Sequence, residues 1–108
     1  KGYRPLTIAA LEGNGELIRT LAAYQADMNA KTSTGASALH VAAWFGNADA
    51  ATALLVARAE PNLTTDDIQQ STPLQLANKN GHTALAILLI GSGANPIPSD
   101  AQQYSLMR

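Results

Sequence analysis

The sequence of 108 residues contains no cysteine, few charged residues and few aromatic residues. Without cysteine the chain has neither a disulfide framework nor thiol chemistry. Charged residues make up 14% of the chain and the formal net charge is −1, so there is no basic surface for a nucleic acid or an anionic membrane. The longest uninterrupted apolar run, Ala84 to Ile90, is much shorter than the roughly 20 residues of a membrane-spanning helix. We therefore expect no nucleic-acid partner and no membrane span.

Alanine is the residue in excess, since it occupies 21 of the 108 positions. Glycine is rarer and reveals a fixed interval more clearly. Three glycines and three leucines each follow one another at intervals of 33 and 35 residues: Gly13, Gly46 and Gly81, and Leu6, Leu39 and Leu74. A period of about 20 to 50 residues indicates a repeat architecture. We therefore expect one domain built of three similar units.

Each unit is interpreted as two short helices followed by an irregular connection. The first helix begins near Pro5, Ala38 or Pro73, and proline suits the first turn because its missing N–H would have had no partner there. The repeat glycine ends this helix, as a left-handed cap does. Second apolar runs follow at residues 17–23, 50–57 and 84–90. In the last two runs apolar residues lie on most sides, which predicts helices buried between neighbours.

Three segments of the chain carry a family resemblance: Pro5-Leu6 with Ala9-Ala10 and Gly13, Ala38-Leu39-His40-Val41-Ala42-Ala43 with Gly46, and Thr72-Pro73-Leu74-Gln75-Leu76-Ala77 with Gly81. They resemble the ankyrin repeat, and the resemblance covers about residues 2 to 98. It implies an all-α solenoid of antiparallel helix pairs joined by β-hairpin-like finger loops.

We expect a single array over residues 1–108, with repeat 1 at 2–34, repeat 2 at 35–69 and repeat 3 at 70–102. Residues 103–108 begin a partial fourth repeat or form a closing helix. The last finger departs from the family pattern, because Gln70 stands where its glycine is expected. The span from Asn62 to Gln70 is also two residues longer than the span from Asn29 to Gly35. The geometry of this finger therefore stays open.

The sequence offers little for catalysis or metal binding. Glu12 and Glu16 are separated by two glycines, so no single helix face presents both carboxylates. We expect His40 to make a structural hydrogen bond from the first helix of its unit to a neighbouring connection. Two histidines without cysteine do not make a structural zinc site, and no calcium-binding loop surrounds Asp66 and Asp67. We expect no enzyme, no cofactor and no metal.

The family resemblance implies a partner surface on the concave face. Its candidate residues are the two before each repeat glycine and those after the finger glycine position: Leu11, Glu12, Trp44, Phe45, Lys79 and Asn80, with Tyr3, Ala36 and Ser71. Trp44 and Phe45 are the only tryptophan and the only phenylalanine of the chain, and tryptophan is enriched among residues that dominate binding energy. The alternative is that one ring lies flat on its own helix or packs under the adjacent finger.

Other residues have structural or competing interpretations. Structural roles are expected for Gly13, Gly46, Gly81, His40, Pro5 and Pro73. The acidic pair Asp66-Asp67 is either a contact for a basic patch on a partner or a loop insertion without a binding role. Tyr24 ends a second helix, and its ring is expected to pack against apolar neighbours.

From these features we expect a non-catalytic protein–protein interaction module that binds a partner of unknown identity on its concave face. One alternative is a structural spacer within a longer repeat array, whose open ends would favour self-association. The other is an accessory or inhibitory subunit of an enzyme. The sequence contains no signal segment, which favours a cytoplasmic protein over an exported mature form, the alternative that stays open.

Overall fold

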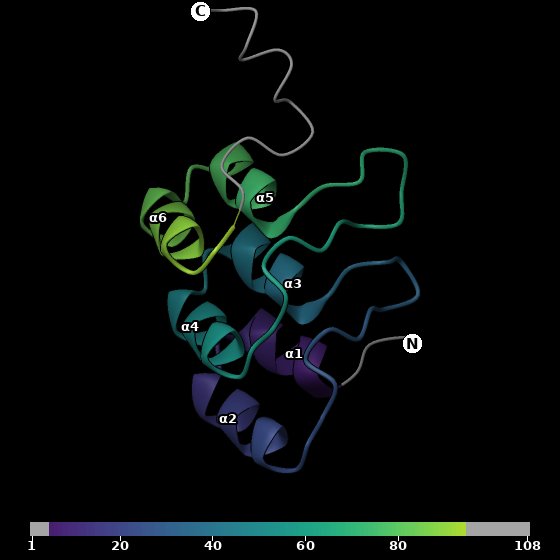
Figure 1. Cartoon of the computed structure of the whole chain (residues 1–108), viewed down its shortest axis with the longest axis vertical. Helices are drawn as coiled ribbons and strands as arrows, with labels where there is room; N and C mark the ends of the chain where they lie inside the picture. The colour runs from purple at the N-terminus through teal and green to yellow at the C-terminus, as the bar shows by residue number, and fades with distance from the viewer. Residues whose placement is uncertain (1–4, 95–108) are drawn as a thin grey trace, which may run out of the picture.

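The computed structural model describes residues 5–94 and contains six helices in this range (Figure 1). They are α1 (Pro5–Glu12), α2 (Gly15–Ala23), α3 (Ala38–Phe45), α4 (Ala48–Val56), α5 (Pro73–Lys79) and α6 (Thr83–Gly91). The described residues contain no β-strand, only an isolated antiparallel bridge between Lys31 and Ser37. The predicted all-α solenoid is confirmed. Tyr3 and the predicted partial repeat or closing helix at 103–108 lie outside the described residues.

The helices form two layers. The first helices of the units, α1, α3 and α5, stack on one another in one layer, and α2, α4 and α6 stack beside them in the second (Figure 1). The α2–α3 and α4–α5 connections, which we call fingers, project away from the first layer on the side opposite α2, α4 and α6. A surface is thereby formed between the fingers and the first helices.

Local sequence explains where the first helices begin. Ser37 and His40 form a capping box at α3: the His40 N–H donates to Ser37 Oγ (3.4 Å) and the Ser37 N–H donates to His40 Nδ1 (3.1 Å). Thr72 and Gln75 repeat this arrangement at α5, where Pro73 occupies the first turn. Such boxes satisfy backbone N–H groups that have no partner within the helix.

Glycines in the left-handed region follow the first helices. Gly13, Gly46 and Gly81 have φ values of 71°, 70° and 76°, so the left-handed conformation expected of them is confirmed. In the last finger Gln70 takes a φ of 47° at the position where Gly35 has 85°. This finger therefore keeps a left-handed residue at that position although it lacks the glycine.

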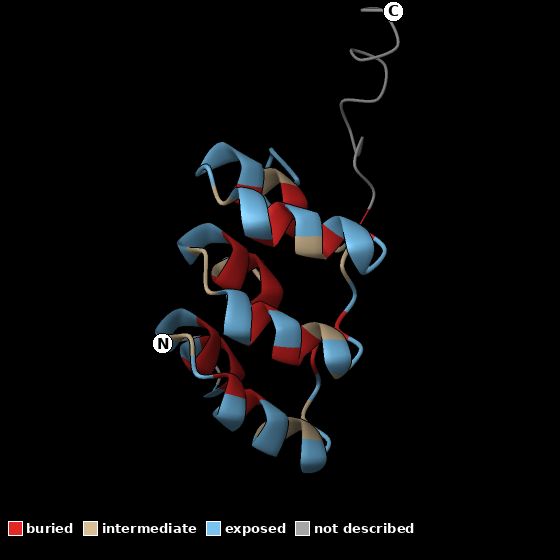
Figure 2. Cartoon of the chain, turned by 90° about the vertical axis from the view of Figure 1, so that its left-hand side faces the viewer, coloured by how far each residue is buried: buried red, intermediate tan, exposed pale blue. Residues whose placement is uncertain are grey.

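Alanines provide the close packing between units. Ala9, Ala10, Ala42, Ala43 and Ala77 are completely buried in the first-helix layer, where α3 contacts both α1 and α5. A methyl group lets neighbouring helix backbones approach closely, and larger buried leucines belong to the same core cluster. Figure 2 shows buried segments where helices face one another and exposed segments on the outer turns.

Two expectations about the outer helices are wrong. Tyr24 is 83% exposed rather than packed against apolar neighbours. Ile87 of α6 is 65% exposed, and Val56 of α4 and Ile90 of α6 are exposed as well, so these helices are not buried on most sides. The reason is that α2, α4 and α6 form the outer layer and contact other helices only on their inner faces and along the stack.

Hydrogen bonds between units close the ends of α1 and α3. Asn47 Nδ2 donates to the carbonyls of Ala10 (2.8 Å) and Leu11 (3.0 Å). In the next unit Asn80 Nδ2 (2.8 Å) and His82 Nε2 (3.1 Å) contact the carbonyl of Trp44. The last carbonyls of a helix have no partner within it, so each unit completes the first helix of the unit before it.

His40 links α3 to the following finger. Its Nδ1 accepts from the Ser37 N–H and hydroxyl, and its Nε2 lies 2.9 Å from the carbonyl of Ser71. These partners require a neutral ring that carries its proton on Nε2. Burial lowers the pKa of His40 below its ordinary value, while hydrogen bonds to the backbone of Ser71 and Leu63 act in the opposite direction. The expected structural hydrogen bond from His40 to a neighbouring connection is confirmed.

We predict that Gly46→Ala destabilises the protein more than Gly81→Ala. Both alanines would occupy the left-handed region, which costs about 1–2 kcal/mol. A Cβ at Gly46 would also lie 2.6–2.9 Å from His82 ring atoms, whereas nothing lies within 4 Å of one at Gly81. The crowding adds roughly 1–3 kcal/mol. Urea unfolding followed by circular dichroism measures both variants, and equal losses would show that contact with His82 does not constrain position 46.

We predict an acid-induced loss of stability that depends on His40. Its pKa is lower in the folded chain than in the unfolded chain, so the contribution to stability is complete above about pH 6.5 and is lost as the pH falls through the folded pKa. Urea unfolding between pH 7.5 and pH 5 should show this loss in His82→Asn, which keeps His40. His40→Gln, which copies the residue at position 75, should lack it. An unchanged pH dependence in His40→Gln would contradict the prediction.

Candidate partner-binding surface

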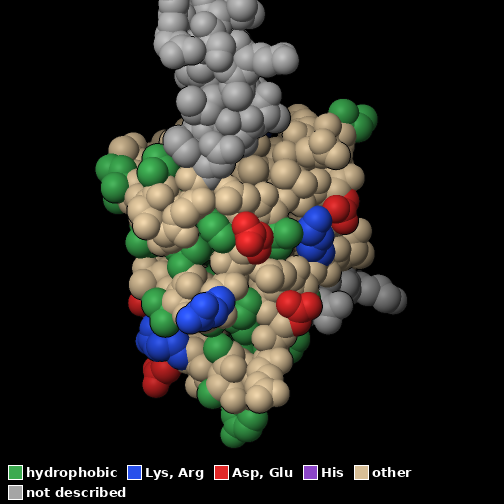
Figure 3. Space-filling model, in the orientation of Figure 1, with side chains coloured by type: hydrophobic (Ala, Val, Ile, Leu, Met, Phe, Trp, Pro, Cys, Tyr) green, Lys and Arg blue, Asp and Glu red, His purple; other side chains and the backbone are tan. Residues whose placement is uncertain are grey.

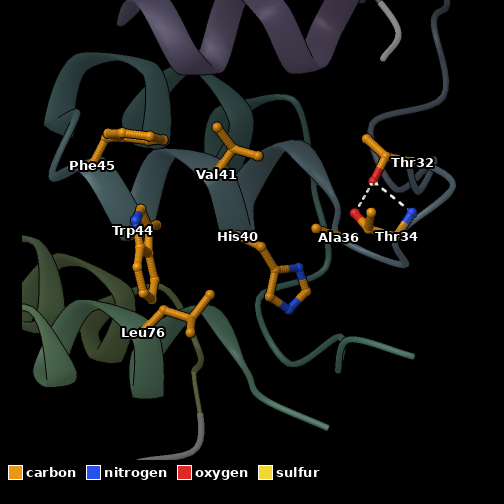
Figure 4. Close-up of a pocket in the computed structure, with 8 residues that line it drawn as sticks. All are labelled: Thr32, Thr34, Ala36, His40, Val41, Trp44, Phe45 and Leu76. Carbon is orange, nitrogen blue, oxygen red and sulfur yellow. Dashed lines mark hydrogen bonds between the residues drawn. The ribbon is translucent and has the colours of Figure 1, made fainter. Parts of the chain in front are cut away.

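A groove with a volume of about 270 Å³ lies between α3, the α2–α3 finger and α5. The finger contributes Thr32, Thr34 and Ala36, α3 contributes His40, Val41, Trp44 and Phe45, and α5 contributes Leu76. Figure 4 shows these side chains, with Trp44 pointing toward Leu76. The walls are mostly apolar, and the groove spans the boundary between the second and third units. We call it the groove below.

Trp44 is held by the third unit, yet its ring remains accessible. Its carbonyl accepts from Asn80, and Lys79 Nζ lies 5.9 Å from the centre of its ring, within the range of a cation–π interaction. The Trp44 side chain is 42% exposed and that of Phe45 is 53% exposed. Val41 and Phe45 point toward the other side of α3 (Figure 4). Both residues are therefore partly covered and partly accessible.

The finger forms a rigid wall of the groove. The Thr32 and Thr34 hydroxyls are 2.8 Å apart, and the Thr32 N–H donates to the carbonyl of Ala36 (2.9 Å). The next finger packs directly behind this turn, since a Cβ at Gly35 would lie 2.8 Å from Asp66 N. Lys31 joins the two fingers by donating to the carbonyl of Thr64 and to Asp66 Oδ1, both at 2.8 Å.

The structure adds residues that the sequence analysis missed. Ile8 of α1 is exposed and occupies the position that Val41 occupies in α3. Leu11, already a candidate from the sequence, is exposed as well and corresponds to Trp44. Val41 and Leu76, in equivalent positions, both line the groove. Helical spacing could have revealed Ile8, Val41 and Leu76 in the sequence, because each of them lies one turn before a residue already assigned to the concave face. We define the apolar stripe as Ile8, Leu11, Val41, Trp44, Phe45 and Leu76.

The acidic finger already uses both of its carboxylates within the chain. Asp66 pairs with Lys31 at 2.8 Å. Asp67 Oδ1 accepts from the Thr65 hydroxyl (2.6 Å) and from the Gln70 N–H (3.0 Å). The hydrogen bond from Thr65, followed by that from Gln70, lowers the pKa of Asp67. These contacts support the loop interpretation, and contact with a basic partner stays a prediction.

The described residues offer binding geometry rather than a reactive centre. No group of three or more histidine, aspartate or glutamate side chains among residues 5–94 could hold a metal ion. Glu12 ends α1, whereas Glu16 lies in α2, and both ring nitrogens of His40 have partners. No helix in residues 5–94 has the length and apolar character to cross a bilayer. On the face shown in Figure 3, charges of both signs are scattered and form no large patch of one sign.

Comparison with known proteins identifies the repeat throughout the described structure. A family model described as "Ankyrin repeats (3 copies)" matches residues 1–66, and one described as "Ankyrin repeat" matches residues 69–101. The crystal structure of the human ASB11 ankyrin repeat domain superposes with a TM-score of 0.77 at 33% identity. That match covers 86% of this chain and 41% of the solved one.

Three curated relatives are much longer than this chain. The human transient receptor potential cation channel subfamily A member 1 is 32% identical over 94 residues, which are 86% of this chain and 8% of the channel. The mouse nuclear factor NF-kappa-B p105 subunit is 31% identical over 98 residues, 90% of this chain and 10% of that protein. The Caenorhabditis elegans ankyrin repeat and KH domain-containing protein mask-1 is 28% identical over 89 residues, 82% of this chain and 3% of that protein.

Proposed function

Because the chain belongs to the ankyrin repeat family, we propose that it is a non-catalytic module that binds a partner protein on its concave face. Ankyrin repeats generally serve as protein–protein interaction modules and form a non-catalytic fold. The proposal for this chain is more specific, since it assigns the binding surface to the groove and the apolar stripe. An enzyme that uses the chain as an accessory or inhibitory subunit would be one kind of partner.

The exposed pair Trp44 and Phe45 carries this proposal. Two adjacent aromatic side chains, 42% and 53% exposed, lie on the middle unit of the described array and line the groove. Water contact with large apolar surfaces is unfavourable, and an exposed apolar patch with a polar rim is typical of a protein-binding site. Tryptophan near the centre of such a patch is the usual residue with a dominant contribution to affinity.

A second candidate function, a spacer within a longer array, is favoured by the surface at the α1–α2 end. A hollow of about 220 Å³ lies there, lined by Pro5, Leu6, Leu21, Ala26, Asp27 and Ala30. Leu21 and Ala26 are only partly buried, whereas the equivalent Leu54 and Ala59 of the second unit are buried, where α2 packs against α4. Another repeat of the same kind would fill this hollow. The chain also covers 10% or less of each of the three curated relatives named above.

The spacer function predicts that the purified chain self-associates through this surface. Static light scattering should then give a mass above 11.2 kDa, and Leu21→Glu should return it to the monomer mass because a buried carboxylate is unfavourable. Tyr24→Glu, at a position exposed to solvent, is the control that leaves the mass unchanged. A monomer at millimolar concentration would count against the spacer function.

The interaction function predicts that Trp44→Ala weakens binding without unfolding the chain. A partner recovered from cell extract and purified should bind the variant roughly 30-fold less tightly, since a central tryptophan contributes about 2 kcal/mol or more. Isothermal titration calorimetry measures the affinity, and thermal circular dichroism measures folding. Tyr24→Ala removes an exposed aromatic ring at the end of α2 and should bind like the wild type. Unchanged binding with a lowered Tm would instead make Trp44 a packing residue.

A further inference from the structure

The apolar stripe continues across all three first helices. Ile8 and Leu11 in α1, Val41 and Trp44 in α3, and Leu76 in α5 occupy two equivalent positions one helical turn apart. Neighbouring packed helices lie about 8–10 Å apart, so consecutive apolar anchor points along the stripe have this spacing. The stripe therefore extends over about 16–20 Å from α1 to α5.

The two ends of the stripe carry opposite charges. Lys79 occupies in α5 the position that Leu11 occupies in α1 and Trp44 occupies in α3. Its Nζ lies over the Trp44 ring. Glu12 ends α1 at the opposite end and is exposed. The ion pairs found within residues 5–94 are Arg19–Asp49 and Lys31–Asp66, so neither Glu12 nor Lys79 is neutralised by a described side chain. An apolar surface with a cation at one end and an anion at the other favours a partner with the complementary order.

The groove is suited to side chains of a protein partner rather than to a cofactor. Its volume of about 270 Å³ lies at the lower limit of the roughly 300–1,000 Å³ of small-molecule pockets. Strand addition requires an exposed sheet edge, whereas residues 5–94 contain no strand. We therefore expect side chains of the partner to insert into the groove, without backbone pairing between strands.

The spacing of the stripe matches a helix better than an extended segment. In an α-helix, residues i and i+7 lie on one face and are about 10.5 Å apart, close to the spacing of the helices beneath. In an extended segment, residues on one face are about 6.6 or 13 Å apart, and neither distance matches. A helical partner can thus place one apolar anchor on each unit.

Resting on the function proposed above, we propose that the stripe binds an amphipathic α-helix of a partner protein. Its apolar face lies on the stripe and inserts a side chain into the groove beside Trp44 and Leu76. An acidic residue at one end of this helix pairs with Lys79, and a basic residue at the other end pairs with Glu12.

Selection from a displayed library of random 16-residue peptides tests the proposal with the full chain immobilised. Enriched peptides should carry apolar residues at i, i+7 and i+14 on one helical face, with an acid near one end and a base near the other. Synthetic copies should become helical on binding, as circular dichroism measures, and should bind Trp44→Ala at least 10-fold more weakly.

Charge reversal then tests the two ends separately. The best peptide is synthesised with mixed, doubly basic or doubly acidic ends. Lys79→Glu should shift the preference about fivefold toward the doubly basic peptide, and Glu12→Lys should shift it about fivefold toward the doubly acidic one, as expected for exposed ion pairs. Arg19→Glu, which changes a cation of α2 outside the stripe, should leave the preference unchanged.

The outcomes separate this inference from the proposed function. Peptides that depend on Trp44 but bind in an extended conformation, or that ignore both charge reversals, overturn the helical partner and leave the binding surface in place. A selection without any peptide that depends on Trp44 overturns both.

Discussion

The stack depends on hydrogen bonds that side chains of one unit make to the last carbonyls of the first helix in the unit before it. The last carbonyls of α1 and α3 have no partner within their own helices, and Asn47, Asn80 and His82 of the following units supply the contacts. Helices of eight residues are marginal when isolated. Their stability therefore comes from neighbours, through these hydrogen bonds and through alanines that let the helix backbones approach.

The same contacts shape the binding surface. Asn80 and His82 fix the backbone of Trp44 from the third unit, while Lys31 fixes the finger opposite through Thr64 and Asp66. The groove thus lies between walls whose positions are set by more than one unit. A preorganised wall loses little conformational entropy when a partner binds. The polar contacts between units therefore hold the apolar binding surface in place, although they are not part of that surface.

Sequence pattern predicted those features that local chemistry controls. The left-handed glycines and the hydrogen bond from His40 to the next finger both follow from residues at fixed positions in the unit. Pattern failed for Tyr24 and for the exposed side of α6, because burial depends on how many layers surround a helix. It also missed Ile8, Val41 and Leu76, since the glycine used as the reference marks the end of the helix and not the turn before it.

The sequence alone determined the repeat, the helix pairs and the identity of the aromatic pair, because a period, a cap and a residue type are local properties. Tertiary structure decided which of the candidate side chains are available to a partner. Asp66 pairs with Lys31, which is 35 residues away in the sequence, and Lys79 lies over Trp44, which is equally distant. A carboxylate or ammonium group has the same sequence signature whether free or paired, and only the stacking of one unit on the next brings such partners together.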